Sequence, residues 1–143
     1  MMKTVVKTHV GAYGIIIKND EIALIRKARG GYKGKLDLPG GGVEHTEVPE
    51  ETLKRELMEE IGCEVKDYEL MDVTATNIKW KMNEEEWEDL HHIGILYNVN
   101  ILGDILKNEA DGLDSEGANW YKINELNKDE LSPFTRYVIE KLK

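Results

Sequence analysis

Residues 55–62 read RELMEEIG, so Glu56, Glu59 and Glu60 fall within little more than one helical turn. Residues three and four apart on a helix are neighbours, and like charges at these spacings cost about 0.2–0.5 kcal/mol per pair. Hard divalent cations such as Mg²⁺ prefer oxygen ligands and commonly bind one or two carboxylates together with substrate phosphates. The three glutamates could therefore hold a metal ion, or they could form an acidic helix face on a wet surface.

The sequence around the glutamates predicts a glycine-rich loop followed by a helix over residues 49–61. Pro49 suits the first helical turn because its missing N–H costs little there. Gly62 stands where a C-terminal cap is expected. An apolar stripe would face the core, and the three glutamates would lie on an adjoining face. The stripe consists of Leu53, Leu57 and Ile61.

Other charged residues could support the three glutamates. Glu44 and Glu47 lie in the loop before the helix and could add metal ligands or orient them. Arg55 lies one turn after Glu51 and one turn before Glu59, so it could hold either carboxylate in place.

Strand patterns dominate the rest of the chain. Residues 9–18 and 21–28 read as two strands joined by a turn at Asn19 and Asp20. The other predicted strands cover residues 63–82 (one or two strands), 91–102 and 118–123, and the other predicted helices cover 124–131 and 132–143. The last helix has Ser132 as its predicted N-cap and Pro133 as its first residue. This order predicts an α/β sandwich of mixed sheet and flanking helices.

Length and composition favour one globular domain over residues 1–143. The net charge of −9 argues against a stable nucleic-acid partner. Residues 1–36, however, hold eight basic and two acidic residues, which suits a phosphorylated ligand, although a chance asymmetry of a solvated surface is the alternative. The single cysteine, and the lack of a signal-peptide pattern or a long apolar run, predict a cytoplasmic protein that makes no membrane contact.

Residues 41–63 resemble the box of the Nudix hydrolase family. The positions in register are Gly41, Glu47, Arg55, Glu56, Leu57, Glu59, Glu60 and Gly62. Cys63 stands at the final aliphatic position, Thr46 stands where a glycine is common, and Leu36 replaces a frequent tryptophan. Pro39 and Gly40 fit the usual lead-in. The resemblance implies a Nudix-type α/β/α sandwich, with a mixed β-sheet and flanking helices.

The resemblance also implies metal-dependent hydrolysis of a diphosphate linkage in a nucleotide, by attack of water on phosphorus. Glu56, Glu59 and Glu60 would bind Mg²⁺ or Mn²⁺, and Glu47 with Arg55 would be the catalytic supporting pair. The general base could be a box glutamate or a distal acid such as Glu116, for which an exposed turn residue is the alternative. The small chain leans toward MutT-like pyrophosphohydrolases. A non-catalytic nucleotide sensor is the competing function, and the chain could form a homodimer.

Substrate binding is expected beside the box. Gly40 and Gly41 would approach the substrate, and Arg26 and Arg29 are the favoured phosphate contacts in the basic stretch 26–35, although a solvated loop explains that stretch as well.

Aromatic and histidine residues outside the box are predicted mainly as structural. Trp80 or Trp87 could stack on a nucleobase, but packing is the commoner role of tryptophan. His91 and His92 would face opposite sides of a strand, so they should not share a metal. The acidic run 84–89 is expected to be a solvated loop or helical turn.

Overall fold

The computed structural model describes residues 2–142, so Met1 and Lys143, the ends of the predicted domain, lie outside the described residues. The elements run β1 (Lys3–Ile15), β2 (Ile17–Lys18), β3 (Glu21–Lys27), β4 (Leu36–Asp37), β5 (Gly40–Gly42), α1 (Pro49–Ile61), β6 (Val65–Lys81), β7 (Glu86–Ile101), β8 (Ser115–Lys122) and α2 (Pro133–Leu142). Two short 3₁₀ segments, η1 (Ile123–Glu125) and η2 (Lys128–Glu130), connect β8 to α2. Neither helix of the described chain is long and apolar enough to cross a membrane.

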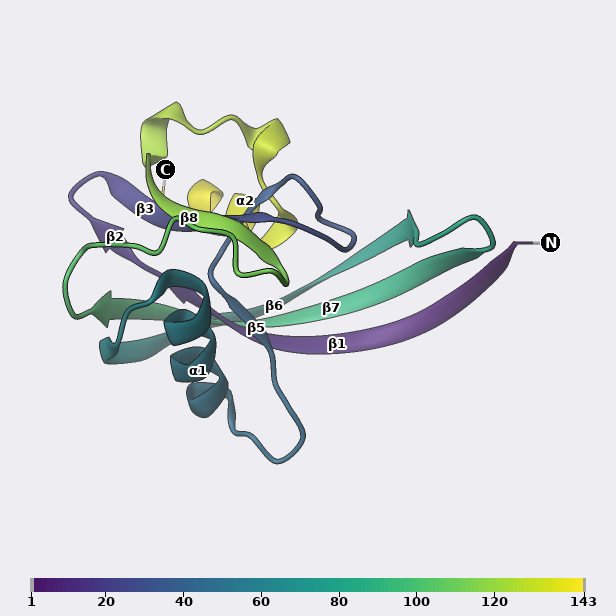
Figure 1. Cartoon of the computed structure of the whole chain (residues 1–143), viewed down its shortest axis with the longest axis horizontal. Helices are drawn as coiled ribbons and strands as arrows, with labels where there is room; N and C mark the ends of the chain where they lie inside the picture. Colours follow the sequence, from purple (N-terminus) through teal and green to yellow (C-terminus); the bar gives the residue numbers. More distant parts are fainter. Residues whose placement is uncertain (1, 143) are drawn as a thin grey trace.

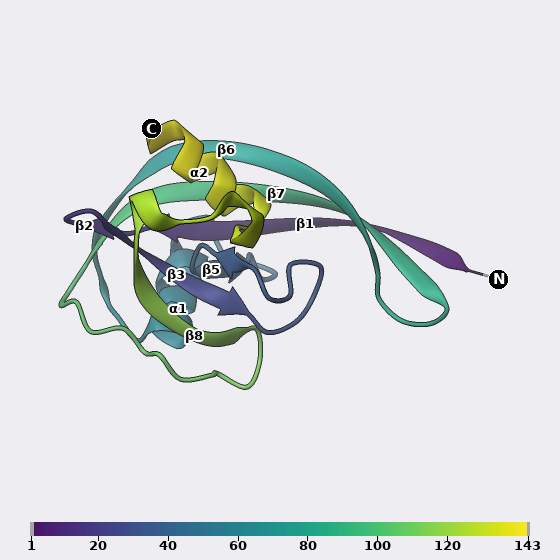
Figure 2. The ribbon, with the colours of Figure 1, turned by 90° about the horizontal axis from the view of Figure 1, so that it is seen from above.

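The strands form two four-stranded sheets (Figures 1 and 2). One sheet has the order β5-β1-β7-β6, and in it β1 and β7 pair in parallel while the other neighbours are antiparallel. In the other sheet β3 pairs with β2, β4 and β8, always antiparallel. The mixed sheet that the sequence predicted is therefore present.

The core has two parts because alternate residues of a strand point to opposite faces. Ala12 of β1 and Ala23 of β3 belong to the cluster that contains the apolar stripe of α1. Their neighbours Tyr13 and Ile22 belong to a second cluster, which contains the buried face of α2. The strands thus lie between the two helices, which confirms the predicted α/β/α sandwich.

Helix α1 begins and ends as the sequence predicted. Gly62 follows it in the left-handed region, with φ of 71°, and donates its N–H to the carbonyls of Leu57 and Met58. At the other end a Glu51 carboxylate oxygen accepts the backbone N–H of Val48 at 3.1 Å. Glu51 therefore caps the helix, and it is Glu59 rather than Glu51 that contacts Arg55.

Two structural predictions need correction. The segment 124–131 does not form an α-helix, since only the 3₁₀ segments η1 and η2 occur there. The acidic run 84–89 is not a loop throughout, because residues from Glu86 onward belong to β7, whose partners β1 and β6 extend equally far. Residues 65–81 form the single strand β6, and Pro133 is the first residue of α2 as predicted.

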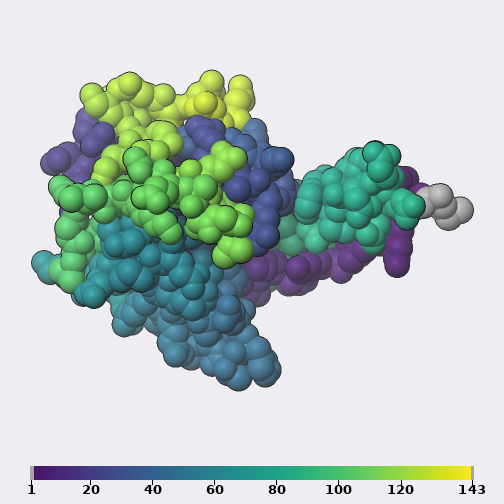
Figure 3. All heavy atoms as spheres, in the orientation of Figure 1, coloured from purple at the N-terminus to yellow at the C-terminus, as the bar shows by residue number. Residues whose placement is uncertain are grey.

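The outer ends of β1, β6 and β7 form an arm that projects from the body of the molecule (Figure 3). Lys3 of β1 pairs with Glu86 of β7, and Lys81 of β6 pairs with Trp87. Val6, on this arm, is 78% exposed. Toward the body, β6 packs against the loop between β3 and β4, where a Cβ at Gly31 would lie 2.5 Å from the Ile78 side chain.

Candidate functional site

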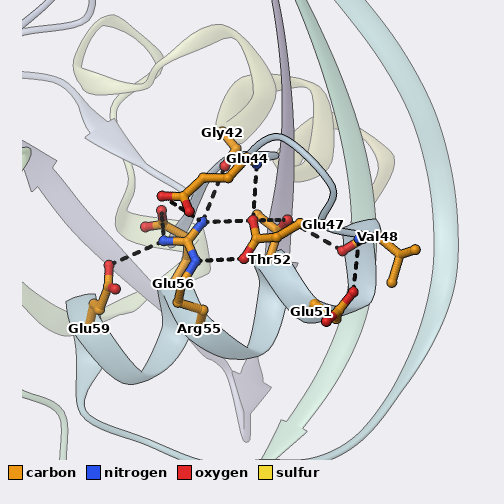
Figure 4. Close-up of polar contacts among 9 residues, drawn as sticks. All are labelled: Gly42, Glu44, Glu47, Val48, Glu51, Thr52, Arg55, Glu56 and Glu59. Carbon is orange, nitrogen blue, oxygen red and sulfur yellow. Dashed lines mark hydrogen bonds and ion pairs between the residues drawn. The ribbon is translucent and has the colours of Figure 1, made fainter.

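Arg55 organises the carboxylates of the box (Figure 4). Its Nε donates to Glu47 Oε2 at 2.8 Å and its Nη2 donates to Glu47 Oε1 at 3.0 Å, which makes a bidentate pair. Its Nη1 donates to Glu56 Oε1 at 2.9 Å and lies 3.5 Å from Glu59 Oε2. A fixed guanidinium fork of this kind holds carboxylates in place better than a single point charge would.

Glu47 is further fixed from the loop and the helix. Its Oε1 accepts the Thr52 hydroxyl at 2.8 Å and the backbone N–H of Glu44 at 3.0 Å. Hydrogen bonding from Arg55 lowers the pKa of Glu47 to about 2. Glu47 and Arg55 thus lie together at the junction of loop and helix, as the supporting pair would require.

The three glutamates of α1 differ in exposure, so they do not form one uniform charged face. The Glu59 side chain is 53% exposed and the Glu56 side chain is 16% exposed. Glu60 is 3% exposed and accepts the backbone N–H of Gly40 at 2.7 Å. A helix turns about 100° per residue, so the adjacent Glu59 and Glu60 point in different directions with Glu56 between them, and the set runs from solvent to the core boundary.

Burial acts on the two inner carboxyls. It raises the pKa of Glu60 well above the ordinary value, and the Gly40 N–H opposes the rise. It also raises the pKa of Glu56, against the stabilising contact with Arg55. Burial therefore destabilises the anionic form of both groups in the protein alone, and a cation beside them would offset that cost.

The glycine strand β5 brings backbone close to these carboxylates. A Cβ at Gly41 would lie 2.6 Å from the Glu56 carboxyl carbon. Gly40 has φ of 146°, and a Cβ there would lie 2.1 Å from the Ala12 carbonyl oxygen. Gly40 must be glycine because of this backbone contact and its φ, whereas a side chain at Gly41 would displace the Glu56 carboxylate, so the backbone beside the glutamates stays open where a substrate could approach.

A pocket of about 420 Å³ opens next to β5. The glycines Gly40–Gly42 form one side of it, and aromatic side chains form another. Its other lining residues include Tyr13, Lys27, Arg29, Tyr32, Asp37, Trp80, Glu88, His92 and Asp114. A second cavity of about 540 Å³ shares Gly31, Tyr32 and Trp80 with this pocket and continues toward α2.

The basic stretch does not meet the pocket as the sequence suggested. Arg26 donates to the Gly34 carbonyl at 2.8 Å and does not line the pocket. Arg29 does line it, but pairs with Asp114 at 2.7 Å. Lys27 also lines the pocket, and among residues 2–142 its ammonium makes no hydrogen bond or salt bridge. Lys27 therefore has unused hydrogen-bonding capacity, and so has Lys7, which lines the same pocket and within residues 2–142 also makes no side-chain hydrogen bond or salt bridge.

The remaining candidate residues differ in their relation to the pocket, which Trp80 and His92 line. Trp80 lines the pocket and donates its indole N–H to Glu88 at 2.8 Å, whereas Trp87 lies under the Lys79 ammonium on the arm. His92 is buried and His91 is exposed, which confirms that they face opposite sides. Glu116 is exposed on β8 and, within the described chain, forms no contact with the box that the structure records.

Three pocket residues carried no recognisable signal in the sequence. Tyr13, Tyr32 and His92 lie far apart in the chain, and their hydroxyl and ring nitrogen atoms join in one hydrogen-bonded chain. Asp37, buried against the Ser132 hydroxyl at 2.6 Å, also lines the pocket. The only local indication of a polar group in the pocket was Asp37 itself, an acid between the apolar residues Leu36 and Leu38.

The donor set fits a hard divalent cation in chemistry, since the candidate ligands Glu56, Glu59 and Glu60 all offer carboxylate oxygen. Over residues 2–142 no three acidic, histidine or cysteine side chains converge as a ready metal cluster. Arg55 instead donates to oxygen atoms of Glu56 and Glu59, and Glu60 accepts the Gly40 N–H. Glu59, the most exposed of the three candidate ligands, has the most freedom to leave that contact.

An α/β/α sandwich with a glycine strand beside an arginine-held set of carboxylates defines a class of protein suited to phosphate chemistry. The family model described as NUDIX domain matches residues 7–142, and the chain belongs to this family, as the box predicted.

Relatives cover most of the chain. The 8-oxo-dGTP diphosphatase of Escherichia coli (strain K12) is 32% identical over 142 residues, which cover 92% of this chain and 94% of the relative. The ADP-ribose pyrophosphatase of Methanocaldococcus jannaschii is 33% identical over 119 residues, but the match covers only 64% of that protein. A solved MutT NUDIX hydrolase from Burkholderia pseudomallei has a TM-score of 0.76 at 25% identity, over 96% of this chain and 99% of the other. The chain is a Nudix hydrolase of the MutT-like type.

Proposed function

We propose that the chain hydrolyses a diphosphate linkage of a nucleoside triphosphate, using a divalent metal held by Glu56, Glu59 and Glu60. The observation that carries the proposal is the Arg55 cluster beside the open glycine strand, at the edge of a pocket with aromatic walls. The Escherichia coli relative supports a nucleoside triphosphate, because the match covers nearly its whole length. Mg²⁺ or Mn²⁺ is the ion we expect.

Each part of the site has a separate task. Bound metal would neutralise phosphate oxygens and lower the pKa of an attacking water. Arg55 and Glu47 keep the helix and loop in register, so that the three carboxylates stay beside β5. Gly40 and Gly41 let the phosphates lie close to the backbone, and Lys27 offers its ammonium to them from the pocket wall.

Some alternatives have specific support. ADP-ribose or another nucleoside diphosphate derivative is the second candidate substrate, because the Methanocaldococcus jannaschii relative is an ADP-ribose pyrophosphatase. A non-catalytic nucleotide sensor is disfavoured because the box retains every acidic residue. The cytoplasm as the place of action and a homodimer stay predictions, and so do a box glutamate or Glu116 as the general base.

The test is release of phosphate products from a panel of nucleoside triphosphates, ADP-ribose and dinucleoside polyphosphates, with Mg²⁺ or Mn²⁺ present. Wild type should hydrolyse one class in the panel. Glu56→Gln and Glu59→Gln should lose about 100-fold or more in kcat, since removal of a metal-binding or acid–base carboxylate costs that much.

Glu64→Gln is the matched control, because Glu64 is an exposed acid just beyond the helix. It should keep wild-type activity. Full activity in both box variants would contradict the proposed ligand set. A wild type that binds a nucleotide but hydrolyses nothing in the panel would favour the sensor.

A further inference from the structure

A buried hydrogen-bonded chain crosses the floor of the 420 Å³ pocket. The Tyr13 hydroxyl oxygen lies 2.7 Å from His92 Nε2, and the Tyr32 hydroxyl oxygen lies 2.9 Å from His92 Nδ1. Tyr13, His92 and Tyr32 are 4%, 4% and 8% exposed, and all three line the pocket. The proposed hydrolysis gives none of them a task.

The protonation states in this chain are restricted. Burial lowers the pKa of His92 to about 3, with His9 and Lys27 lowering it further, so the ring is neutral near pH 7. Burial raises the pKa of both tyrosines above the ordinary value, so both keep their protons. A neutral imidazole has one N–H and one acceptor nitrogen. One hydroxyl must therefore donate to the ring, and the other must accept from it.

The surroundings of Tyr13 decide which hydroxyl donates. Its ring packs against Phe134, and its hydroxyl occupies the space that a side chain at residue 11 would need, since a Cβ at Gly11 would lie 2.4 Å from it. Among residues 2–142 the recorded partner of this hydroxyl is His92 Nε2. Because a buried hydroxyl proton without an acceptor is costly, Tyr13 donates to Nε2. His92 then carries its proton on Nδ1 and donates it to Tyr32.

With its oxygen accepting from His92, Tyr32 keeps its own proton for another partner. We infer that the Tyr13–His92–Tyr32 chain fixes the Tyr32 hydroxyl as a hydrogen-bond donor to a nucleobase bound in the pocket. The base would present an acceptor there, a carbonyl oxygen or a ring nitrogen.

The pocket favours a base over a phosphate as the partner of Tyr32. Trp80, held by Glu88, adds a second aromatic side chain beside Tyr32, and bases stack on such faces. The inference rests on the proposed function in taking this pocket as the nucleoside site. It makes Tyr32 a specificity-determining residue, and Tyr13 and His92 positioning residues.

The tautomer can be measured on wild type, without ligand, by ¹⁵N NMR of the His92 ring. The expected result is a proton on Nδ1 and a lone pair on Nε2. A proton on Nε2 would overturn the inference, because Tyr32 would then have to donate to Nδ1. This measurement needs neither activity nor a variant.

The donor itself is tested by calorimetric binding of AMP, GMP, CMP and UMP, with ribose 5-phosphate as a probe that lacks a base. Tyr32→Phe should weaken the tightest-binding of the four roughly three- to tenfold, as loss of one hydrogen bond does. It should leave ribose 5-phosphate binding unchanged. Tyr68→Phe, on β6 outside this pocket, is the matched control and should bind like wild type.

Equal weakening of ribose 5-phosphate would overturn the nucleobase as partner in favour of the phosphate. Unchanged nucleotide binding in Tyr32→Phe, or no binding of any of the four to wild type, would also overturn the inference. Hydrolysis of the diphosphate panel is judged separately, so failure of the base contact and failure of the proposed reaction can be told apart.

Discussion

Two side-chain clusters flank the same pocket and differ in almost every respect. The Arg55 cluster is charged, partly exposed and drawn from residues 44–59. The His92 cluster is neutral, buried and drawn from β1, the β3–β4 loop and β7. Charges stand where water and phosphates can reach them, and neutral donors and acceptors stand deeper, where an unpaired charge would be costly.

The two clusters also reach their order by different means. In the charged cluster one guanidinium pairs with four carboxylates, those of Glu44, Glu47, Glu56 and Glu59, so position depends on a single residue with a fixed geometry. In the neutral cluster each tyrosine hydroxyl and each His92 ring nitrogen has one partner, and the positions of these side chains depend on the packing of the strands around them. Loss of the central residue should therefore lower activity in the first cluster, and weaken the pH dependence of stability in the second.

The largest expected effect is that of Arg55→Gln. Without the guanidinium, Glu47 and Glu56 lose their bidentate and monodentate partners, and the carboxylates shift away from β5. Misplacement of catalytic groups by about 1 Å costs roughly 100-fold, so kcat/KM for the best substrate should fall by about that factor. Steady-state hydrolysis with Mg²⁺ measures it, with circular dichroism to verify the fold.

Lys54→Gln is the control, because Lys54 is the preceding residue of α1 and is exposed. Its kcat/KM should stay near the wild-type value. If Arg55→Gln keeps activity within threefold of wild type, the carboxylates hold their positions without the arginine and the contrast between the clusters fails.

The next effect concerns His92 and pH. The pKa of His92 is lowered to about 3 by burial, whereas an unfolded histidine titrates near 6.5. Between these values the unfolded chain binds a proton that the folded chain does not. The contribution of His92 to stability is therefore complete above pH 6.5 and is lost as the pH falls toward 3, at about 1.4 kcal/mol per pH unit.

Urea unfolding at pH values from 7 to 4 tests this. In His92→Gln the free energy of unfolding should fall less steeply below pH 6.5 than in wild type, by up to that slope. His91→Gln, at the exposed neighbouring position, should retain the wild-type slope. Parallel curves for wild type and His92→Gln would show that the ring accepts a proton in the folded state.

The same contrast explains what the sequence could predict. The Arg55 cluster was predictable because helical spacing indicated a contact of Arg55 with Glu51 or Glu59, of which Glu59 is observed, and the resemblance to the Nudix box implied the pairing of Glu47 with Arg55. Helix α1 was likewise placed correctly from Pro49 and Gly62.

The His92 cluster depends on parallel pairing of β1 with β7, which sets His9 opposite His92 and brings Tyr13 alongside. Pairing between two strands whose residues lie some 80 positions apart leaves no local pattern in the sequence. The helix expected over 124–131 failed for a related reason, since those residues turn from β8 back to α2, where only short 3₁₀ segments fit.

The smallest effect should come from Lys27, which lies between the two clusters. Its charge opposes the rise in the pKa of Glu60 that burial causes, and adds to the lowering in the pKa of His92 that burial causes. The Lys27 charge therefore acts on titratable groups on both sides of the pocket. Lys27→Gln should raise KM for a nucleoside triphosphate about tenfold with little change in kcat, as loss of a charged hydrogen bond to phosphate does.

The comparison is with the double variant Arg26→Gln and Arg29→Gln, the cations that the sequence favoured. Arg26 is engaged with the Gly34 carbonyl and Arg29 with Asp114, so the double variant should raise KM only several-fold. Initial rates over a range of substrate concentrations give both constants. A larger KM for the double variant than for Lys27→Gln would return the phosphate contact to the arginines. Lys27 would then not be the phosphate-binding residue between the Arg55 cluster and the His92 cluster.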